Sequence, residues 1–162
     1  MNKVLDSSLY RIIHQNMPIN CVDVVLKTTD RGFLMIKRKE EPAKDQWWLP
    51  GGRVLRNESL VSAAKRKVLE ETNLRIKSLD KIVNGYELLF RGDPFDHGGG
   101  THSICTCYSA EVKDLSSLKM DECHSESKVF SHYISEWHPY LRYCLGQAGY
   151  ESDDFSLSEL DC

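Results

Sequence analysis

The sequence lacks the features that would place it in a membrane or nucleic-acid-binding class. It has no run of about 18 apolar residues, so no segment predicts a membrane-spanning helix. A formal charge of −3 and a pI near 6.1 argue against the basic surface that nucleic acid attracts. The N-terminus has no apolar segment followed by a small-residue cleavage site. We therefore expect a cytoplasmic protein whose partners are neither nucleic acids nor membranes.

Paired cysteine motifs are also missing. The six cysteines are scattered, and Cys105 and Cys107 are separated by one residue, where a zinc-binding pair usually has at least two. Alternation along a strand would place both on the same face. An intracellular chain keeps its thiols reduced, so no disulfide framework is expected.

The length of the chain limits its domain organisation. A chain of 162 residues with 41% hydrophobic content can form one domain with a sizeable hydrophobic core, but it is short for two stable domains. We assign residues 1–148 to a single domain. Residues 149–162 are acidic and poor in apolar residues, and we expect them to form a flexible tail, with a docking peptide as an equally open interpretation.

The strongest local feature is a glycine turn, Gly51-Gly52, that leads into a helix. From about residue 57 to 72 the apolar residues recur every three or four positions, which predicts one buried helical face. Asn57 is expected to cap its N-terminus, and Asn73 to end it in a left-handed conformation. Glu70 and Glu71 are adjacent near its end, and neighbouring carboxylates repel unless a cation lies between them. The obvious cation is a divalent metal.

Strands are predicted on both sides of this helix. Residues 19–27 and 33–37 flank turn chemistry at 29–32 and are typical of a hairpin. Alternating apolar residues predict further strands at 79–90, 102–112 and 128–134, and helices are expected at 7–16, capped by Ser7 or Ser8, and at 135–146, capped by Ser135.

Two positions in the hairpin can contact a ligand. Asp23 interrupts an apolar strand, and such a carboxylate costs free energy unless it lies at an exposed edge or contacts a ligand. The sequence leaves both alternatives open. Arg38 lies in a run of three cations at a strand end, which is usually a solvated rim but can also hold phosphate.

The stretch GGRVLRNESLVSAAKRKVLEETNL resembles the Nudix box, whose pattern is G, five residues, E, seven residues and REUXEEXGU, with U aliphatic. The matching positions are Gly52, Glu58, Arg66, Val68, Glu70, Glu71 and Leu74. Asn73 replaces the glycine, and Lys67 replaces the first Glu of REUXEE, a carboxylate that in most Nudix enzymes binds metal or acts as a base. Lys67 lies one turn before Glu71, close enough to pair with it. The resemblance implies an α/β/α sandwich around a mixed sheet.

Most of residues 9–145 are similar to the GDP-mannose mannosyl hydrolase branch of the Nudix hydrolases. The similarity rests on KRKEEPAKDQWWLPGGRVLRNESLVSAA, on the strand that carries Asp23, and on the later Thr101-His102 and DECH segments. It implies a homodimeric hydrolase that uses Mg²⁺, or alternatively Mn²⁺, on a nucleoside diphosphate sugar such as GDP-mannose. Water would attack the anomeric carbon and release the nucleoside diphosphate and the hexose.

The same resemblance implies roles for individual residues. Gly51, Glu70 and Glu71 would hold the metal, and Asp23, Arg38 and Arg53 would contact the substrate. The catalytic groups would be Arg66, which orients the acids, and His124, which takes a proton from water. Glu122 and Glu126 are expected to orient His124. The chain departs from the branch at Cys123, where relatives have a metal-binding glutamine, and at Ser103, where they have a substrate-binding tyrosine.

Other interpretations stay open. The loop at residues 91–100 is either a lid or a plain mobile loop, and its His97 is either an active-site group or solvated. The protein could instead be a Nudix pyrophosphatase that attacks phosphorus of an NDP-sugar, ADP-ribose or a nucleotide, with Glu122 or Glu126 as the base. Lys67 and Cys123 together favour a third possibility, a catalytically silent nucleotide-binding module.

Overall fold

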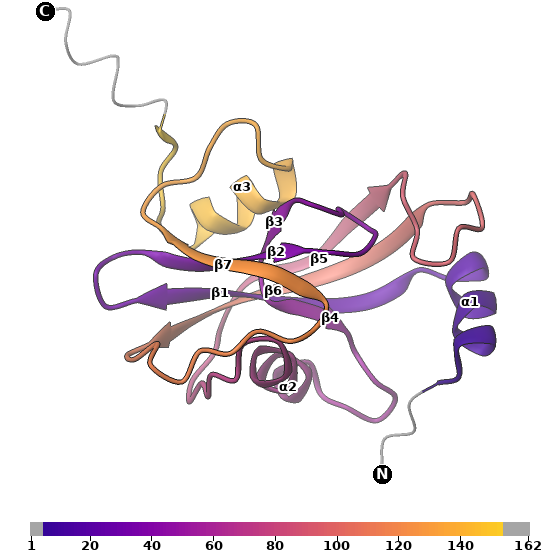
Figure 1. Ribbon diagram of the computed structural model, residues 1–162, viewed down its shortest axis with the longest axis horizontal. Coiled ribbons are helices and arrows are strands. Elements are labelled where there is room, and N and C mark those ends of the chain that lie inside the picture. Colours follow the sequence, from indigo (N-terminus) through magenta and orange to yellow (C-terminus); the bar gives the residue numbers. More distant parts are fainter. Residues whose placement is uncertain (1–4, 154–162) are drawn as a thin grey trace, which may run out of the picture.

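Helices cover both faces of a twisted mixed sheet in the computed structural model, which describes residues 5–153 (Figure 1). The predicted α/β/α sandwich is thereby confirmed. In chain order the elements are α1 (Ser7–Asn16), β1 (Ile19–Thr28), β2 (Phe33–Arg38), β3 (Trp47–Trp48), β4 (Gly51–Arg53), α2 (Leu60–Thr72), β5 (Asp80–Phe90), β6 (Thr101–Val112), β7 (His124–Phe130) and α3 (Pro139–Gln147).

Strand β1 is the centre of the sheet. It pairs in parallel with β6 over its whole length, from Ile19 opposite Ser103 to Thr28 opposite Val112, and antiparallel with β2 and β4. The order is β3-β2-β1-β6-β5, with β7 paired to β2. Because helices cover both faces, the middle of β1, residues 22–26, is buried on both sides and is apolar except for Asp23, as a central strand should be.

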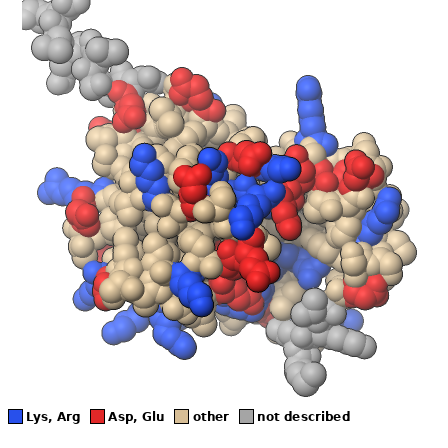
Figure 2. Space-filling model, viewed as in Figure 1, with Lys and Arg blue, Asp and Glu red and all other residues tan. Residues whose placement is uncertain are grey.

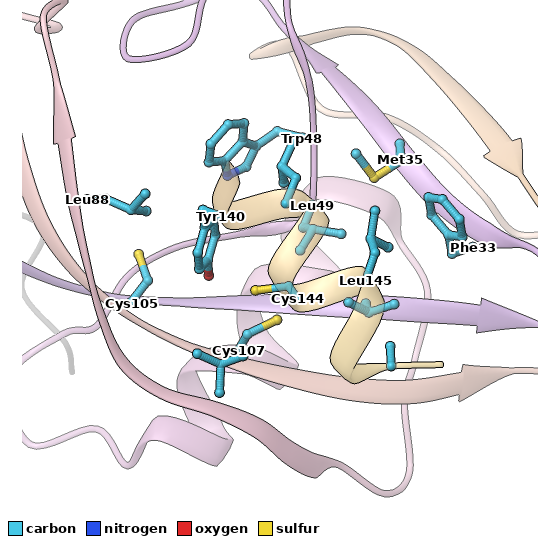
Figure 3. Packing of buried hydrophobic residues seen from close by; sticks show 14 of the residues in the cluster. Phe33, Met35, Trp48, Leu49, Leu88, Cys105, Cys107, Tyr140, Cys144 and Leu145 are labelled. Atoms are coloured by element: carbon cyan, nitrogen blue, oxygen red, sulfur yellow. The ribbon is translucent and has the colours of Figure 1, made fainter. Parts of the chain in front are cut away.

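Each face of the sheet has its own core. Helix α2 packs Ala64 and Val68 against one face, and α3 packs Leu141 and Leu145 against the other. Figure 3 shows the core on the α3 side, with Cys144 and Leu145 of the helix pointing into it. Both Cys105 and Cys107 belong to the α3 side, as alternation along β6 requires. All five cysteines within residues 5–153 are free thiols.

Two helix boundaries differ from the sequence prediction. Helix α2 is capped by Ser59, whose Oγ accepts a 3.1 Å hydrogen bond from the Ser62 amide, whereas Asn57 lies outside the helix with φ 64°. Helix α3 begins at Pro139, not Ser135, because proline disfavours a helical conformation in the residue before it. The prediction for Asn73 is confirmed, since it ends α2 in the left-handed region with φ 57°.

The cap of α1 and the bounds of β7 also differ from the prediction. Asp6, not Ser7 or Ser8, caps α1, because its carboxylate accepts two backbone N–H groups. Strand β7 runs from His124 to Phe130 rather than over 128–134.

The chain after α3 folds back onto the sheet before the described residues end. The Tyr150 hydroxyl donates a 2.7 Å hydrogen bond to the Gly32 carbonyl, and Ser152 forms a β-bridge with Tyr133. These residues belong to the segment that the sequence assigned to the tail, whose remainder, 154–162, lies outside the described residues. Over residues 5–153, no helix is long and apolar enough to cross a membrane.

Candidate active site

The buried carboxylate of Glu71 is the centre of the site. Only 6% of the residue is exposed, and Oε2 accepts a 2.9 Å hydrogen bond from the Gly51 amide. Its other oxygen, Oε1, lies 2.7 Å from Nζ of Lys67. Glycine is required at position 51, because a Cβ there would lie 2.0 Å from Oδ1 of Asp23 and 2.3 Å from the Val22 carbonyl. The close approach of β4 to β1 therefore brings Glu71 and Asp23 to the same place.

Arg66 connects α2 to the residues that follow the glycine turn. Its guanidinium binds Glu58 through two hydrogen bonds of 2.7 and 2.8 Å, and it donates a 3.0 Å bond to the Arg53 carbonyl. It also pairs with Glu70 at 3.0 Å. The hydrogen bonds from Arg66 hold the pKa of Glu58 below its usual range. Arg66 therefore fixes Glu58 and Glu70, and with them the geometry of the turn.

Asp121 and His124 form a hydrogen-bonded pair at the start of β7. Nδ1 of His124 lies 2.6 Å from Oδ1 of Asp121, and the histidine side chain is only 4% exposed. The same oxygen accepts a 3.0 Å bond from the Cys123 amide. Ligand atoms of Glu71, Asp121 and His124 all lie within 4.8 Å of one another. The loop before β7 thus brings a third acid and an imidazole to the carboxylate of α2.

The residue that contacts His124 was not among the sequence predictions. Glu122 and Glu126 were expected to orient it, but Glu126 pairs with Lys37 at 3.0 Å, and the Glu122 backbone carbonyl accepts from Lys39. Asp121 takes that role instead. Its bond to the amide two residues later is an Asx turn, the one local signal that could have identified it.

The donor atoms fit a hard divalent cation. Glu71 and Asp121 supply carboxylate oxygens, which Mg²⁺ and Mn²⁺ prefer, and the His124 imidazole suits Mn²⁺ more than Mg²⁺. Glu70 is less suited to this role. Its side chain is 49% exposed, and its Oε2 already pairs with both Arg66 and Lys67. Acidic side chains gather near the middle of the face seen in Figure 2, with basic side chains beside them.

A cavity of about 180 Å³ lies on the other side of Gly51, whose amide binds Glu71; Glu71, Asp121 and His124 themselves do not line it. It is lined by residues from α1, from all strands except β7, and from the loops after β2 and β5. Among them are the predicted substrate-binding residues Asp23, Arg38 and Arg53. Thr101 and Ser103 also line it, and both are nearly buried. Gly51 and Asp23 contribute to the cavity wall as well, so the cavity and the acidic cluster share a boundary.

Asp23 is buried at that boundary and is not an exposed edge residue. It is 4% exposed, and its Oδ2 accepts a 2.7 Å hydrogen bond from the Tyr140 hydroxyl. Figure 3 shows Tyr140 on α3 between Trp48 and Cys105. Loss of water contact raises the pKa of Asp23 to about 6, although the Tyr140 bond acts in the opposite direction.

The two arginines of the cavity are held by different contacts. Nε of Arg38 donates a 2.6 Å hydrogen bond to the Pro42 carbonyl. The guanidinium carbon of Arg53 lies 3.9 Å from the ring centroid of Tyr10, a cation–π contact. Nη1 of Arg53 is buried without a hydrogen-bond partner in the part of the chain that the structure describes. An anionic ligand would satisfy it, because a buried unpaired donor costs free energy.

Helix α1 and the loop after β5 close one side of the cavity. Nδ1 of His14 lies 2.8 Å from Nε2 of His97, and the His97 side chain is 2% exposed rather than solvated. Asp93 accepts backbone hydrogen bonds from Phe95, His97 and Gly98. Burial, together with the neighbouring His97, lowers the pKa of His14. The loop is therefore an ordered wall, although His97 itself does not line the cavity.

A sequence model of the NUDIX domain matches residues 17–151. Among curated proteins, the low-salt glycan biosynthesis protein Agl8 of Haloferax volcanii is 30% identical over 132 residues, which is 82% of this chain and 83% of Agl8. The ADPR-responsive transcriptional repressor NtrR of Acinetobacter baylyi is 33% identical over 72 residues, which is 41% of this chain and only 29% of the repressor.

Solved structures agree on the fold. A MutT NUDIX hydrolase from Burkholderia pseudomallei superposes with a TM-score of 0.67 at 22% identity, over 82% of this chain and 98% of its own. The NUDIX domain of Shewanella oneidensis NrtR, solved with ADP-ribose, gives a TM-score of 0.57 at 20% identity, over 78% of this chain and 83% of its own.

Proposed function

The chain belongs to the NUDIX family, and from this premise we propose that it is a divalent-metal-dependent hydrolase of nucleoside diphosphate sugars of the GDP-mannose type. The observation that carries the proposal is the pair of Asp121 and the buried His124 beside Glu71, whose carboxylate is bound by the amide of Gly51, a residue that lines a cavity with two arginines. Gly51 then connects the proposed base and metal site with the anion-binding wall of the cavity.

The cavity supports a substrate that is both anionic and polar. Arg38 and Arg53 would bind the diphosphate, and the unpaired Nη1 of Arg53 is available to it. Asp23 would accept hydrogen bonds from sugar hydroxyl groups. The name of Agl8 refers to glycan biosynthesis, a process that consumes activated sugars, and the NrtR domain was solved with ADP-ribose, itself a nucleoside diphosphate sugar.

Glu71 is the proposed metal ligand on α2, together with the Gly51 carbonyl, and Asp121 is the candidate from the loop before β7. Glu70, the other acid assigned to the metal, would contribute only if it exchanged its contacts with Arg66 and Lys67. A bound Mg²⁺ or Mn²⁺ would neutralise the charge that develops on the departing diphosphate.

His124 is the proposed general base. With Nδ1 hydrogen-bonded to Asp121, its Nε2 is left to accept a proton from water, and Asp121 would stabilise the imidazolium that forms. The activated water would form a bond to the anomeric carbon while the bond from that carbon to the diphosphate oxygen breaks. Arg66, which does not line the cavity, would act by holding Glu58, Glu70 and the glycine turn.

Product analysis tests this proposal directly. The protein is incubated with GDP-mannose and Mg²⁺ or Mn²⁺ in water enriched in oxygen-18. The products are separated by chromatography, and their masses are measured by mass spectrometry. We expect GDP and mannose, with the heavy oxygen in mannose. Mannose 1-phosphate and GMP would refute attack at carbon. A panel of other nucleotide sugars under the same conditions identifies the preferred base and hexose.

Attack at phosphorus is the second candidate. The MutT hydrolase from Burkholderia pseudomallei shares the fold, and a pyrophosphatase of this kind would cleave an NDP-sugar, ADP-ribose or a nucleotide between its phosphates. Glu122 or Glu126 would then be the base. Glu126 is engaged by Lys37, which makes it the weaker choice of the two. Heavy oxygen in a phosphate product would support this alternative.

A silent binding module is the third candidate. It is favoured by the ion pair between Lys67 and Glu71, which occupies one oxygen of the central carboxylate, and by the relative NtrR, whose name describes a repressor that responds to ADPR. Isothermal titration calorimetry would then reveal binding of a nucleotide sugar without turnover. A homodimer and a cytoplasmic location stay predictions of the sequence.

A further inference from the structure

Lys67 occupies the place where the sequence predicted a metal. Its Nζ lies 2.7 Å from Oε1 of Glu71 and 3.4 Å from Oε2 of Glu70, so that one ammonium group bridges both carboxylates. We propose that Lys67 is the resident cation of the acidic site: it keeps a divalent ion out of the Glu70–Glu71 pair and directs that ion to the Asp121 side of Glu71. This inference rests on the proposed function, because it assumes that the site binds a divalent ion.

The glycine turn leaves the space in which the Lys67 side chain lies. A Cβ added to Gly52 would lie 2.9 Å from Cε of Lys67, so the lysine stem passes over position 52 because no side chain is there. Gly52 has φ 142°, which L side chains rarely adopt. The Lys67 side chain is only 18% exposed. The ammonium is therefore held over the acids by packing and does not extend freely into water.

The distribution of charge leaves one side of the cluster negative. The two adjacent acids of α2 are matched by two cations of the same helix, Arg66 on Glu70 and Lys67 on both Glu70 and Glu71. Asp121, by contrast, forms no ion pair with a lysine or arginine within residues 5–153, and its partner is His124. A divalent ion that approaches Glu71 therefore meets repulsion on the Lys67 side and attraction on the Asp121 side.

Lys67 also stabilises the buried carboxylate of Glu71 when no metal is bound. Glu71 is buried, and a carboxylate in that position needs a cation or hydrogen bonds. Lys67 and the Gly51 amide supply both. Without Lys67, the folded state would depend on a bound divalent ion for this charge, and metal binding would contribute more to stability.

The test compares the full chain with Lys67→Met, which keeps the length of the side chain and removes its charge. Lys67→Gln is a second variant in case the first folds poorly. Lys65→Met is the matched control, because Lys65 is on the same helix but donates to the Lys77 carbonyl, at 2.8 Å, and forms no ion pair within residues 5–153. Mn²⁺ alone is the probe. Free Mn²⁺ is counted by electron paramagnetic resonance, and melting temperatures are measured with and without Mn²⁺.

We expect Lys67→Met or Lys67→Gln to bind Mn²⁺ about tenfold more tightly than the wild type, because a like charge next to the ion is removed. We also expect a larger rise in melting temperature with Mn²⁺ for these variants, and no change for Lys65→Met. Affinities and melting shifts that stay within about twofold of the wild type would overturn the inference. So would the absence of Mn²⁺ binding in all of these proteins.

The effect of Lys67 on Mn²⁺ affinity can be measured whichever reaction the protein performs. If no nucleotide sugar is hydrolysed but removal of Lys67 tightens Mn²⁺ binding, the proposed function fails and the role of Lys67 stands. If GDP-mannose is hydrolysed but Mn²⁺ affinity does not respond to Lys67, the proposed function stands and the role of Lys67 fails.

Discussion

The Tyr140 hydroxyl donates a 2.7 Å hydrogen bond to Oδ2 of Asp23, and this contact joins α3 to the central strand across 117 positions of the sequence. A phenol and a carboxyl group meet where the α3 core ends and the cavity begins. Burial raises the pKa of Asp23 to about 6, so the ionised carboxylate is the costly form at neutral pH.

Asp23→Asn should therefore change how stability depends on pH. In the wild type, the folded-state pKa of Asp23 is about 6 and the reference value is 3.8. Between these two pH values the folded state keeps a proton that the unfolded state has released. The contribution of this proton to the free energy of unfolding is therefore fully present below about pH 4 and is lost as the pH rises through about 6. The variant lacks that dependence. It should be more stable than the wild type at pH 8, by up to about 3 kcal/mol, with the difference shrinking towards pH 4. Urea unfolding at a series of pH values measures this, and a difference that does not vary with pH would contradict it.

Tyr140→Phe should have the opposite pH dependence. The hydrogen bond from Tyr140 lowers the pKa of Asp23, so its removal leaves the ionised carboxylate without a buried donor. The loss of stability should be about 1–3 kcal/mol at pH 8 and smaller at pH 4. Tyr143→Phe is the control, because Tyr143 is 49% exposed on the same helix. An equal loss at both pH values would mean that packing alone is responsible.

His124→Ala should lower kcat on the preferred nucleotide sugar by a factor of about 10²–10⁴, the usual contribution of a general base. Asp121→Asn should lower kcat as well, because it disturbs the ring that the acid orients and removes a proposed metal ligand. His102→Ala is the control, since the His102 side chain is 38% exposed and pairs with the exposed Glu87. If His124→Ala stayed within about threefold of the wild type, the base would have to be another group.

Arg66→Lys should destabilise the protein by about 1–3 kcal/mol. A lysine ammonium cannot reproduce the two-pronged bond to Glu58 while also reaching the Arg53 carbonyl. Chemical unfolding measures the effect. Arg75→Lys provides the matched comparison, because Arg75 is an exposed arginine just beyond the same helix. Equal stabilities of the two variants would show that the clamp contributes nothing beyond a positive charge.

His97→Ala should loosen the loop after β5. The variant loses the contact with His14 that ties this loop to α1. Trypsin should then cleave faster after Arg91, at the start of the loop, and His132→Ala should leave the rate unchanged because that side chain is 54% exposed. Unchanged cleavage of His97→Ala would mean that the Asp93 hydrogen bonds and the packing of Phe95 on Tyr10 and His14 hold the loop without His97.

Local chemistry made much of the fold predictable. Asn73 ends α2 as expected, and the pairing of Lys67 with Glu71 follows from helical spacing. Contacts between distant segments were not predictable, because no periodicity encodes them. The bond from Tyr140 to Asp23 and the contact between His14 and His97 belong to this class. Asp121 is a different case, because in the sequence the neighbouring Glu122 and Glu126 are equally plausible partners for His124.

The parallel pairing of β1 with β6 has a consequence for the order in which the chain can fold. The hairpin of β1 and β2 can form while later residues are still being synthesised. The opposite edge of β1 stays unpaired until β6, which ends at residue 112, has been synthesised, because β6 is its partner there. Pairings between such remote segments slow folding and leave a strand edge exposed in the meantime. A nascent chain that stops after α2 would therefore present an unpaired apolar strand, the kind of segment that chaperones bind.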